Sequence, residues 1–441
     1  MMHKKMAGIV ACTALLGLSL SINTHALGVN VLEGKHLNNF VTDDMLLNAD
    51  KDPNNWLHYG RDYEGTRYSP LTQINKDNVS DLVPKWNLSF GVIGAQDSQV
   101  MAVNGRLYVT SSQNLAFGLD GTTGDILWKY QRALPGDLGS KLCCGSVNRG
   151  VAVYKDKVYM ATLDTHMVAL DNNTGEVVWE KKLGDYKTGE ILTSMPMVIN
   201  GMIVIGNSGG DLGANPGTVY ALDADTGELI WKTYTVPMTG KEKIAKSWAG
   251  DSWKTAGGTP WLPPTYDKKT GYILYGVGNP TPDFDGSSRK GDNLYTGSTV
   301  AIDPKDGKIV NHFQYTPHDV WDYDLGSQVT LVDFPADGGT VPALILPSKQ
   351  GQIYVLNRET GESLFPVEER PAPKLGSVEP DYISDTQPYS GYANLNQPPL
   401  TEKDMWGMSP IDQLWCRIQF RRATYEGMYT PPTTDTHWTA Y

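Results

Sequence analysis

One ten-residue phrase occurs three times in this chain, at residues 119–128, 170–179 and 222–231. Each copy reads Leu-Asp, two variable residues, Thr-Gly, an acidic residue, two apolar residues and a tryptophan. The three tryptophans, 51 and 52 positions apart, are Trp128, Trp179 and Trp231. This period fits one four-stranded β-propeller blade per repeat.

Each phrase predicts a strand, a tight turn and a second strand. The aspartate can bond its own backbone, and the glycine allows a positive φ. Weaker copies of the turn stand at 267–271, 303–307 and 357–361, and an earlier blade end is expected at Pro84-Lys85-Trp86. We therefore predict an all-β fold of about seven units, each burying its apolar face against a neighbour.

The composition of the 441 residues, with 46 Gly, 27 Pro and 12 Trp, is typical of a turn-rich β domain. Length alone would suggest two or three domains, but the repeat favours one. The formal net charge is −12, and the chain has no run of Lys and Arg. These properties argue against nucleic acid and anionic membranes as partners, and favour basic proteins.

Residues 1–26 have the pattern of a secretory signal sequence. Lys4 and Lys5 precede an apolar run at 6–20, and Thr-His-Ala at 24–26 suits signal cleavage. The run is too short for a transmembrane anchor. Most of it follows Cys12, which disfavours a lipoprotein signal. We expect a periplasmic protein, in an oxidising compartment, whose single domain covers residues 27–441.

Cys143 and Cys144 are adjacent in the sequence. Neighbouring Cα atoms are ~3.8 Å apart, less than the usual ~4.4–6.8 Å across a disulfide, so a bond between them would close a strained ring. Strain of this kind occurs more often at functional sites than in scaffolds. The alternative is a pair of separate thiols, and the residues alone leave both interpretations open.

Two glycine-rich stretches contain groups that can hold a ligand. Residues 206–213 let the backbone approach a ligand closely, and Asp211 offers a hard oxygen to a cation. Farther along, Gly257 and Gly258 precede Trp261, and the Gly-Asn-Pro motif supplies Asn279. The simpler alternatives are a solvated turn for the first stretch and a core tryptophan for the second.

A dense run of ionisable and aromatic residues occupies positions 316–324. If this segment is extended, Asp322 and Asp324 point to the same face. Two adjacent carboxylates either bind a cation or raise one pKa, as a general base requires. A solvated acidic loop is the alternative.

Several motifs occur together in a fixed order: the tryptophan repeats, the Cys pair, Gly-Asp-Ser-Trp at 250–253, Gly-Asp-Asn-Leu-Tyr at 291–295 and His-Asp-Val-Trp-Asp at 318–322. From about residue 50 to the end, the chain resembles the pyrroloquinoline quinone (PQQ)-dependent dehydrogenases. The resemblance implies an eight-bladed-type propeller. Because it stops near Pro432, we expect a ring that is not closed, as in a fragment, a truncated gene product or a naturally open ring.

The resemblance also implies roles for single residues. Asp322 matches the catalytic base, and Asp211, Asn279, Asp322 and Asp324 are the expected ligands of Ca²⁺. An acid at position 324 also resembles lanthanide-using relatives, so a lanthanide is the alternative metal. Trp261 would lie below PQQ, with the Cys143–Cys144 ring above it. Other residues at cofactor-binding positions are Arg149, Thr193, Ser208, Gly209, Gly210, Lys349 and Asp97.

The implied function is oxidation of an alcohol, polyol or sugar hydroxyl to a carbonyl. Asp211 is typical of the glucose and polyol branch, whereas the Cys pair is typical of the alcohol branch, so the substrate stays open. The chain lacks a Cys-x-x-Cys-His haem motif, so electrons would pass to a separate cytochrome c or a quinone. The alternative function is a non-catalytic propeller that binds proteins in the cell envelope.

Overall fold

The computed structural model describes residues 40–212, 215–255, 257–379, 381–396 and 398–433. The predicted signal sequence lies outside these residues. Four antiparallel sheets in the described part each contain four strands in chain order. Their strands are β1 (Met101–Val103), β2 (Arg106–Ser111), β3 (Leu115–Asp120) and β4 (Ile126–Gln131); β5 (Val151–Tyr154), β6 (Lys157–Ala161), β7 (His166–Asp171) and β8 (Val177–Lys182); β9 (Met197–Ile199), β10 (Met202–Gly206), β11 (Thr218–Asp223) and β12 (Leu229–Tyr234); β13 (Thr265–Tyr266), β14 (Ile273–Gly276), β15 (Ser298–Ile302) and β16 (Ile309–Gln314).

Two smaller sheets follow, one of three strands and one of two. They comprise β17 (Thr330–Ala336), β18 (Gly339–Pro347) and β19 (Ile353–Asn357), then β20 (Val367–Pro371) and β21 (Thr386–Ser390). The α-helices are α1 (Asp43–Leu47) and α2 (Pro410–Arg422). Short 3-10 turns are η1 (Ala49–Lys51), η2 (Val79–Asp81), η3 (Ser112–Asn114), η4 (Leu138–Lys141), η5 (Tyr186–Thr188), η6 (Gly210–Leu212), η7 (Lys243–Ser247), η8 (Ser252–Lys254) and η9 (Glu402–Asp404).

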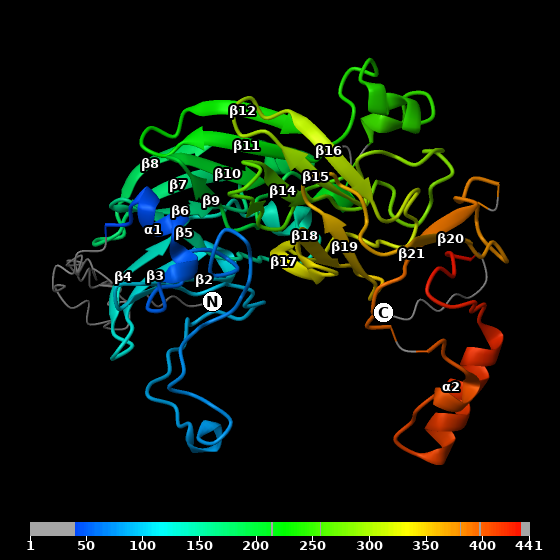
Figure 1. The fold of residues 1–441 in the computed structure, drawn as a ribbon, viewed down its shortest axis with the longest axis horizontal. Helices are drawn as coiled ribbons and strands as arrows, with labels where there is room; N and C mark the ends of the chain where they lie inside the picture. Colours follow the sequence, from blue (N-terminus) through cyan, green and yellow to red (C-terminus); the bar gives the residue numbers. More distant parts are fainter. Residues whose placement is uncertain (1–39, 213–214, 256, 380, 397, 434–441) are drawn as a thin grey trace, which may run out of the picture.

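The sheets follow one another in chain order along an arc (Figure 1). The cyan strands β2–β4 stand at one end and the orange strands β20 and β21 at the other. This arrangement agrees with the predicted propeller-type, all-β architecture. The described residues form six sheets rather than the seven units that the repeats suggested, so the blade count and the closure of the ring are not confirmed.

The repeated tryptophans join neighbouring sheets. Each indole Nε1 donates a hydrogen bond of 2.8–3.3 Å to a carbonyl in the Asp-x-x-Thr-Gly type of turn of the next sheet. The donors and acceptors are Trp86 and Gly121, Trp128 and Asn172, Trp179 and Ala224, and Trp231 and Pro304. The sequence phrase therefore encodes both the turn and the contact between units.

The glycine of each turn is required for two reasons, its backbone conformation and its contact with the docked indole. Its φ lies between +72° and +80°, and a Cβ would stand 2.5–2.8 Å from the docked indole. Any other residue would be strained in this conformation and would push the tryptophan away. These glycines are Gly124, Gly175, Gly227 and Gly307.

Two sequence predictions about the weaker repeats need correction. The turn at 267–271 links β13 to β14, the first two strands of its sheet, whereas the strong turns link the third strand to the fourth. The motif therefore marks a hairpin but not its place in the sheet. Pro84-Lys85-Trp86 lies in no strand, although Trp86 docks as the other tryptophans do.

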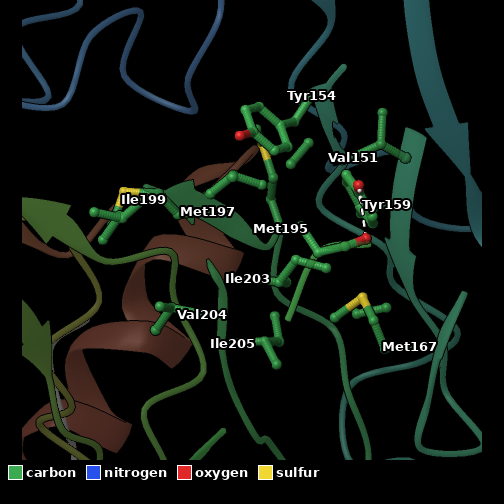
Figure 2. Packing of buried hydrophobic residues seen from close by; sticks show 14 of the residues in the cluster. Val151, Tyr154, Tyr159, Met167, Met195, Met197, Ile199, Ile203, Val204 and Ile205 are labelled. Carbon is green, nitrogen blue, oxygen red and sulfur yellow. Dashed lines mark hydrogen bonds between the residues drawn. The ribbon is translucent and has the colours of Figure 1, made fainter. Parts of the chain in front are cut away.

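The largest core cluster fills the space between consecutive sheets. In Figure 2, Tyr159 and Met167 of the second sheet face Ile203 and Ile205 of the third. All four side chains are buried. Because strand residues alternate between two faces, sheets that are apolar on both sides must be covered on both sides.

The segment before the first sheet crosses several sheets. Trp56 pairs with Ala102 on β1, the Tyr63 hydroxyl donates to the Val198 carbonyl on β9 (2.6 Å), and the Tyr63 carbonyl accepts from Tyr266 on β13 (3.0 Å). These contacts tie the first, third and fourth sheets together. In the described part of the chain, no helix combines the length and the hydropathy that a membrane span requires.

Candidate active site

Lys349 brings the two predicted carboxylates together. Its Nζ lies 3.1 Å from Asp322 Oδ1 and 3.4 Å from Asp324 Oδ2, and it donates to the Asp322 carbonyl at 2.6 Å. Lys349 follows β18, whereas both aspartates belong to the loop between β16 and β17. Tertiary packing therefore unites a cation and two acids that are about 25 positions apart.

The loop is not extended at Asp322, so the condition under which the sequence places Asp322 and Asp324 on one face is not met there. Asp322 has a φ of +60°, a left-handed conformation that is strained for a residue with a Cβ. The buried Asp319 carboxylate accepts hydrogen bonds from the backbone N–H groups of Trp321 (2.9 Å) and Tyr323 (2.8 Å). These two bonds flank Asp322 and hold the strained turn.

Asn279 connects this loop with the Gly-Asn-Pro motif. Its backbone N–H donates to Asp324 Oδ1 (2.8 Å), and its side-chain Nδ2 donates to Asp283 Oδ1 (2.7 Å). The amide oxygen of Asn279 is thereby left as the atom that can bind a cation. A Cβ at Gly278 would stand 2.6 Å from Asp324 Oδ1, so only glycine permits this approach.

The carboxylates share a crowded, partly dehydrated environment. Burial, followed by the charges of Asp211, Asp322 and Asp324, raises the pKa of Asp283 to about 7. Burial also raises the pKa of Asp324 to about 6, against the opposing charge of Lys349. Burial likewise raises the pKa of Asp322, and the charge of Lys349 again opposes the shift. Acids in this condition gain from a divalent cation, which would replace the lost hydration.

Asp211 lies beside the Cys pair. One ligand atom each of Asp211, Cys143 and Cys144 falls within 4.8 Å of the others. Burial, then Cys144 and Asp211, raise the pKa of the Cys143 thiol. The two Sγ atoms are 2.7 Å apart and the cysteines are free thiols. The predicted disulfide is therefore not formed in this structure.

Arg149, Thr193 and Ser208 form one chain of contacts. Arg149 Nη1 donates to Thr193 Oγ1 (2.7 Å), which lies 2.7 Å from Ser208 Oγ. The guanidinium also stands 4.8 Å from the centre of the Trp261 ring. Burial lowers the pKa of Arg149, and the Asp97 charge acts against this shift. Three predicted cofactor contacts and the predicted aromatic platform are thus neighbours.

Gly209 and Gly210 bring the backbone close to neighbouring parts of the chain. Gly209 has a φ of +90°, and a Cβ there would stand 2.0 Å from the Gly189 carbonyl oxygen. The Gly210 carbonyl accepts a hydrogen bond from the Thr281 hydroxyl. This bond links the glycine turn that bears Asp211 to the loop that bears Asn279.

The donor set fits the implied cofactors. By their chemistry, three carboxylates and an amide oxygen suit a hard cation such as Ca²⁺, although within the described residues Asp211 groups within 4.8 Å with the two cysteines and not with Asp322 and Asp324. An arginine beside an indole suits a planar anion. The fit rests on the chemistry of these side chains and on the glycines that give access to them.

The sequence analysis missed four residues that shape the site. They have partners near the predicted residues. Asp319 lies in the His-Asp-Val-Trp-Asp motif at 318–322 but was given no role, and no spacing or motif indicated a role for the other three. Arg289, for instance, contacts mainly backbone carbonyls, which every residue type supplies. These residues are Asp283, Arg289, Asp319 and Glu379.

Comparison with known proteins gives a consistent result. The family model described as "PQQ: Glucose/ethanol/alcohol dehydrogenase, beta-propeller domain" matches residues 56–440. The chain is 38% identical over 340 residues to the quinoprotein alcohol dehydrogenase PedH of Pseudomonas putida, covering 73% of this chain and 56% of that protein. It is 36% identical over 437 residues to the glycerol dehydrogenase large subunit of Gluconobacter thailandicus, covering 88% and 56%.

Solved structures are similar at the level of the fold. Quinohemoprotein alcohol dehydrogenase ADHIIG from Pseudomonas putida HK5 matches with a TM-score of 0.71 at 34% identity, covering 81% of this chain and 53% of that one. A europium-containing methanol dehydrogenase matches with a TM-score of 0.70 at 33% identity, covering 79% and 63%. The chain belongs to the PQQ-dependent quinoprotein alcohol and glycerol dehydrogenase family. It spans about half the length of the curated relatives it matches.

Proposed function

We propose that this protein is a PQQ-dependent dehydrogenase that oxidises a hydroxyl group of an alcohol, polyol or sugar to a carbonyl. One observation carries the proposal: Asp322, Asp324 and Asn279 converge beside Lys349, at distances of 2.8–3.4 Å between contacting atoms. Family membership supports the same reaction class. A propeller used only for binding proteins has no need of this arrangement.

When bound, PQQ accepts the two electrons of the substrate, and a hard cation polarises its reactive oxygens. The protein supplies the base. Asp322 takes the hydroxyl proton, and its position beside Lys349 favours the ionised carboxylate that this role requires. Lys349 also presents positive charge where negative charge develops during the reaction.

The remaining site residues would hold the cofactors. Asp211, Asn279, Asp322 and Asp324 provide the oxygen atoms for the metal. Arg149, with Thr193 and Ser208 behind it, would bind the carboxylates of PQQ, and Asp97 would help to orient the arginine. Trp261 would support the flat rings, and the Cys143–Cys144 pair would cover them, as a disulfide once oxidised.

Ca²⁺ is the metal we propose, with a lanthanide as the competing ion. Asp324 adds a further negative ligand, and a larger total ligand charge favours a trivalent cation. The similarity to a europium-containing methanol dehydrogenase supports testing a lanthanide as the alternative metal. Glycerol and alcohol dehydrogenases among the relatives make a polyol or an alcohol the substrate class to test.

We further propose export to the periplasm through residues 1–26, and transfer of electrons to a separate cytochrome c or a quinone. The net charge of −12 supports a basic cytochrome as the partner. Salt dependence tests this point: the transfer rate to such a cytochrome should fall as ionic strength rises. A rate that ignores ionic strength would contradict it.

The decisive experiment titrates the purified chain with PQQ and Ca²⁺, and separately with PQQ and La³⁺. Dye reduction is followed with a panel of alcohols, polyols and glucose. We expect saturable turnover that depends on both cofactor and metal, and the panel then identifies the substrate class. Absence of PQQ binding with either metal would contradict the proposed function for this chain.

A further inference from the structure

We propose that Arg289 is a positioning residue that fixes the loop of Asn279 and the loop of Asp322 to each other. This inference rests on the proposed function for its consequence, but its structural basis is independent of it. Arg289 is fully buried. Its guanidinium contacts the loop that carries Asn279 and the loop that carries Asp322 at the same time.

On the first loop, Arg289 Nη2 donates to the Pro282 carbonyl (2.8 Å) and lies 3.3 Å from the Asp283 carbonyl. On the second loop, the same nitrogen donates to the Asp319 carbonyl (2.5 Å). The two loops are about 35 positions apart in the chain and share no strand. Arg289, which itself lies between β14 and β15, therefore joins the two loops, in addition to the bond from the Asn279 N–H to Asp324.

Two of the contacted residues, Asp283 and Asp319, act directly on the site. Asp283 accepts from the Asn279 amide, which leaves the Asn279 oxygen for the metal. Asp319 holds the N–H groups on both sides of Asp322. A shift of either loop would move a proposed metal ligand or the proposed base, because the carbonyls that Arg289 contacts belong to these two residues and to Pro282, which precedes Asp283.

The second loop needs such a restraint because it is strained. Asp322 has a φ of +60° and His318 a φ of +49°. Strained residues persist only where surrounding contacts over-determine them. Glu379 adds a third connection: it accepts from the Gly286 N–H (2.5 Å) and lies 3.4 Å from His318 Nε2.

Lysine cannot replace arginine in this role. A guanidinium presents several N–H donors in a rigid fork, whereas an ammonium is a single point of charge on a flexible stem. Arg289 Nε also donates to Pro282 (3.0 Å) and Nη1 to the side chain of Asn293 (2.9 Å), so donors on three nitrogens are used. Arg289→Lys keeps the charge but loses the simultaneous contacts.

The chain offers a matched control in Arg106. This arginine is also buried, and its Nη1 contacts the Asn172 carbonyl and Asn173 Oδ1, both at 3.0 Å. It joins β2 of the first sheet to the turn between β7 and β8 of the second sheet, and neither element belongs to the loops of Asn279 and Asp322. Arg106→Lys therefore also replaces a buried guanidinium by an ammonium, but it does not alter the contacts of the loops of Asn279 and Asp322.

The test measures amide hydrogen exchange of the full chain without cofactor, in peptides that cover residues 318–325. We expect exchange at Trp321 and Tyr323 to be at least tenfold faster in Arg289→Lys than in the wild type. Arg106→Lys should leave these amides within twofold of the wild type. Unchanged exchange in a folded Arg289→Lys protein would overturn the proposal.

If Arg289→Lys does not fold, Asn293→Ser decides the matter, because it removes one partner of the guanidinium and keeps the arginine. We expect at least threefold faster exchange at the same amides, and unchanged exchange would overturn the proposal.

PQQ binding with Ca²⁺ gives the functional readout: affinity should fall at least tenfold in Arg289→Lys and less than twofold in Arg106→Lys. If the wild type binds no PQQ, the proposed function fails, while the exchange data still decide the role of Arg289.

Discussion

The repeated sheets and the site loops are held together in different ways. Between sheets, one tryptophan docks on one glycine turn; this joint occurs three times, and Trp86, which lies in no strand, docks in the same way on the first sheet. The loops around Asp322 are instead held by hydrogen bonds between buried polar groups, and none of these bonds is repeated from sheet to sheet. The joints should therefore govern stability with little effect on chemistry, and the loops should govern chemistry with less effect on stability.

The largest expected effect is that of Asp322→Asn on turnover. An amide cannot take the substrate proton, and loss of a general base typically costs 10²–10⁴-fold. We expect turnover to fall by about that factor, with PQQ affinity within a few fold, as measured by steady-state kinetics and fluorescence titration. Unchanged turnover would remove Asp322 from the mechanism and weaken the contrast between loops and joints.

Trp128→Ala tests the other side of the comparison. Trp128 is buried between the first two sheets, and truncation of such a side chain costs about 3–5 kcal/mol in free energy of unfolding. Urea denaturation measures the loss. Trp415→Ala is the control, because this indole on α2 is 61% exposed and its removal should cost less than about 0.5 kcal/mol. A loss of PQQ affinity in folded Trp128→Ala protein would show that joints and site are coupled.

The site loops should make the cofactor-free protein less stable as pH rises. Burial raises the pKa of Asp319 and Asp283 to about 7 and that of Asp324 to about 6, above an ordinary value of 3.8. The folded state holds these protons more tightly, so its free energy of unfolding should decline between about pH 4 and 7. Each pKa unit by which the folded state holds a proton more tightly corresponds to about 1.4 kcal/mol, so the decline should be large enough to measure.

Urea denaturation at several pH values measures this decline, with Asp283→Asn as the matched variant. The variant lacks one of the three protonated acids, so its decline should be smaller. Added Ca²⁺ should raise stability more at pH 8 than at pH 5, because the metal competes with protons for the carboxylates. A calcium effect that is equal at both pH values would contradict the proposed metal site.

The smallest expected effect comes from Gly227→Ala in a joint. The residue has a φ of +72°, and a Cβ would stand 2.8 Å from Trp179. The left-handed conformation alone costs an alanine about 1–2 kcal/mol, measurable as a shifted urea midpoint. Gly139→Ala provides the control, since nothing lies within 4 Å of its Cβ position. Equal stability of the two variants would show that the joint tolerates a side chain.

The sequence predicted the joints well because their signal is local. Asp120, Thr123 and Gly124 form a turn through contacts within five positions, and the tryptophan follows at a fixed spacing. The same turn chemistry does not state which strands it connects: the weaker copy at 267–271 links the first two strands of its sheet, and its sequence does not show this. The sequence analysis placed Asp322 and Asp324 on one face only if the segment is extended, and this condition does not hold at Asp322, where Asp319 holds a left-handed turn.

By itself, the sequence determined the class of fold, the docked tryptophans and most of the polar groups of the candidate site. Periodicity and turn chemistry depend on neighbouring residues, so they can be recognised along the chain. Only the tertiary structure decided that Lys349 stands between two acids, that Asp283 orients Asn279, and that Arg289 joins two loops. The reason is physical: several of these contacts use backbone carbonyls or amides, which carry no sequence signature, and the partners meet only when the sheets pack.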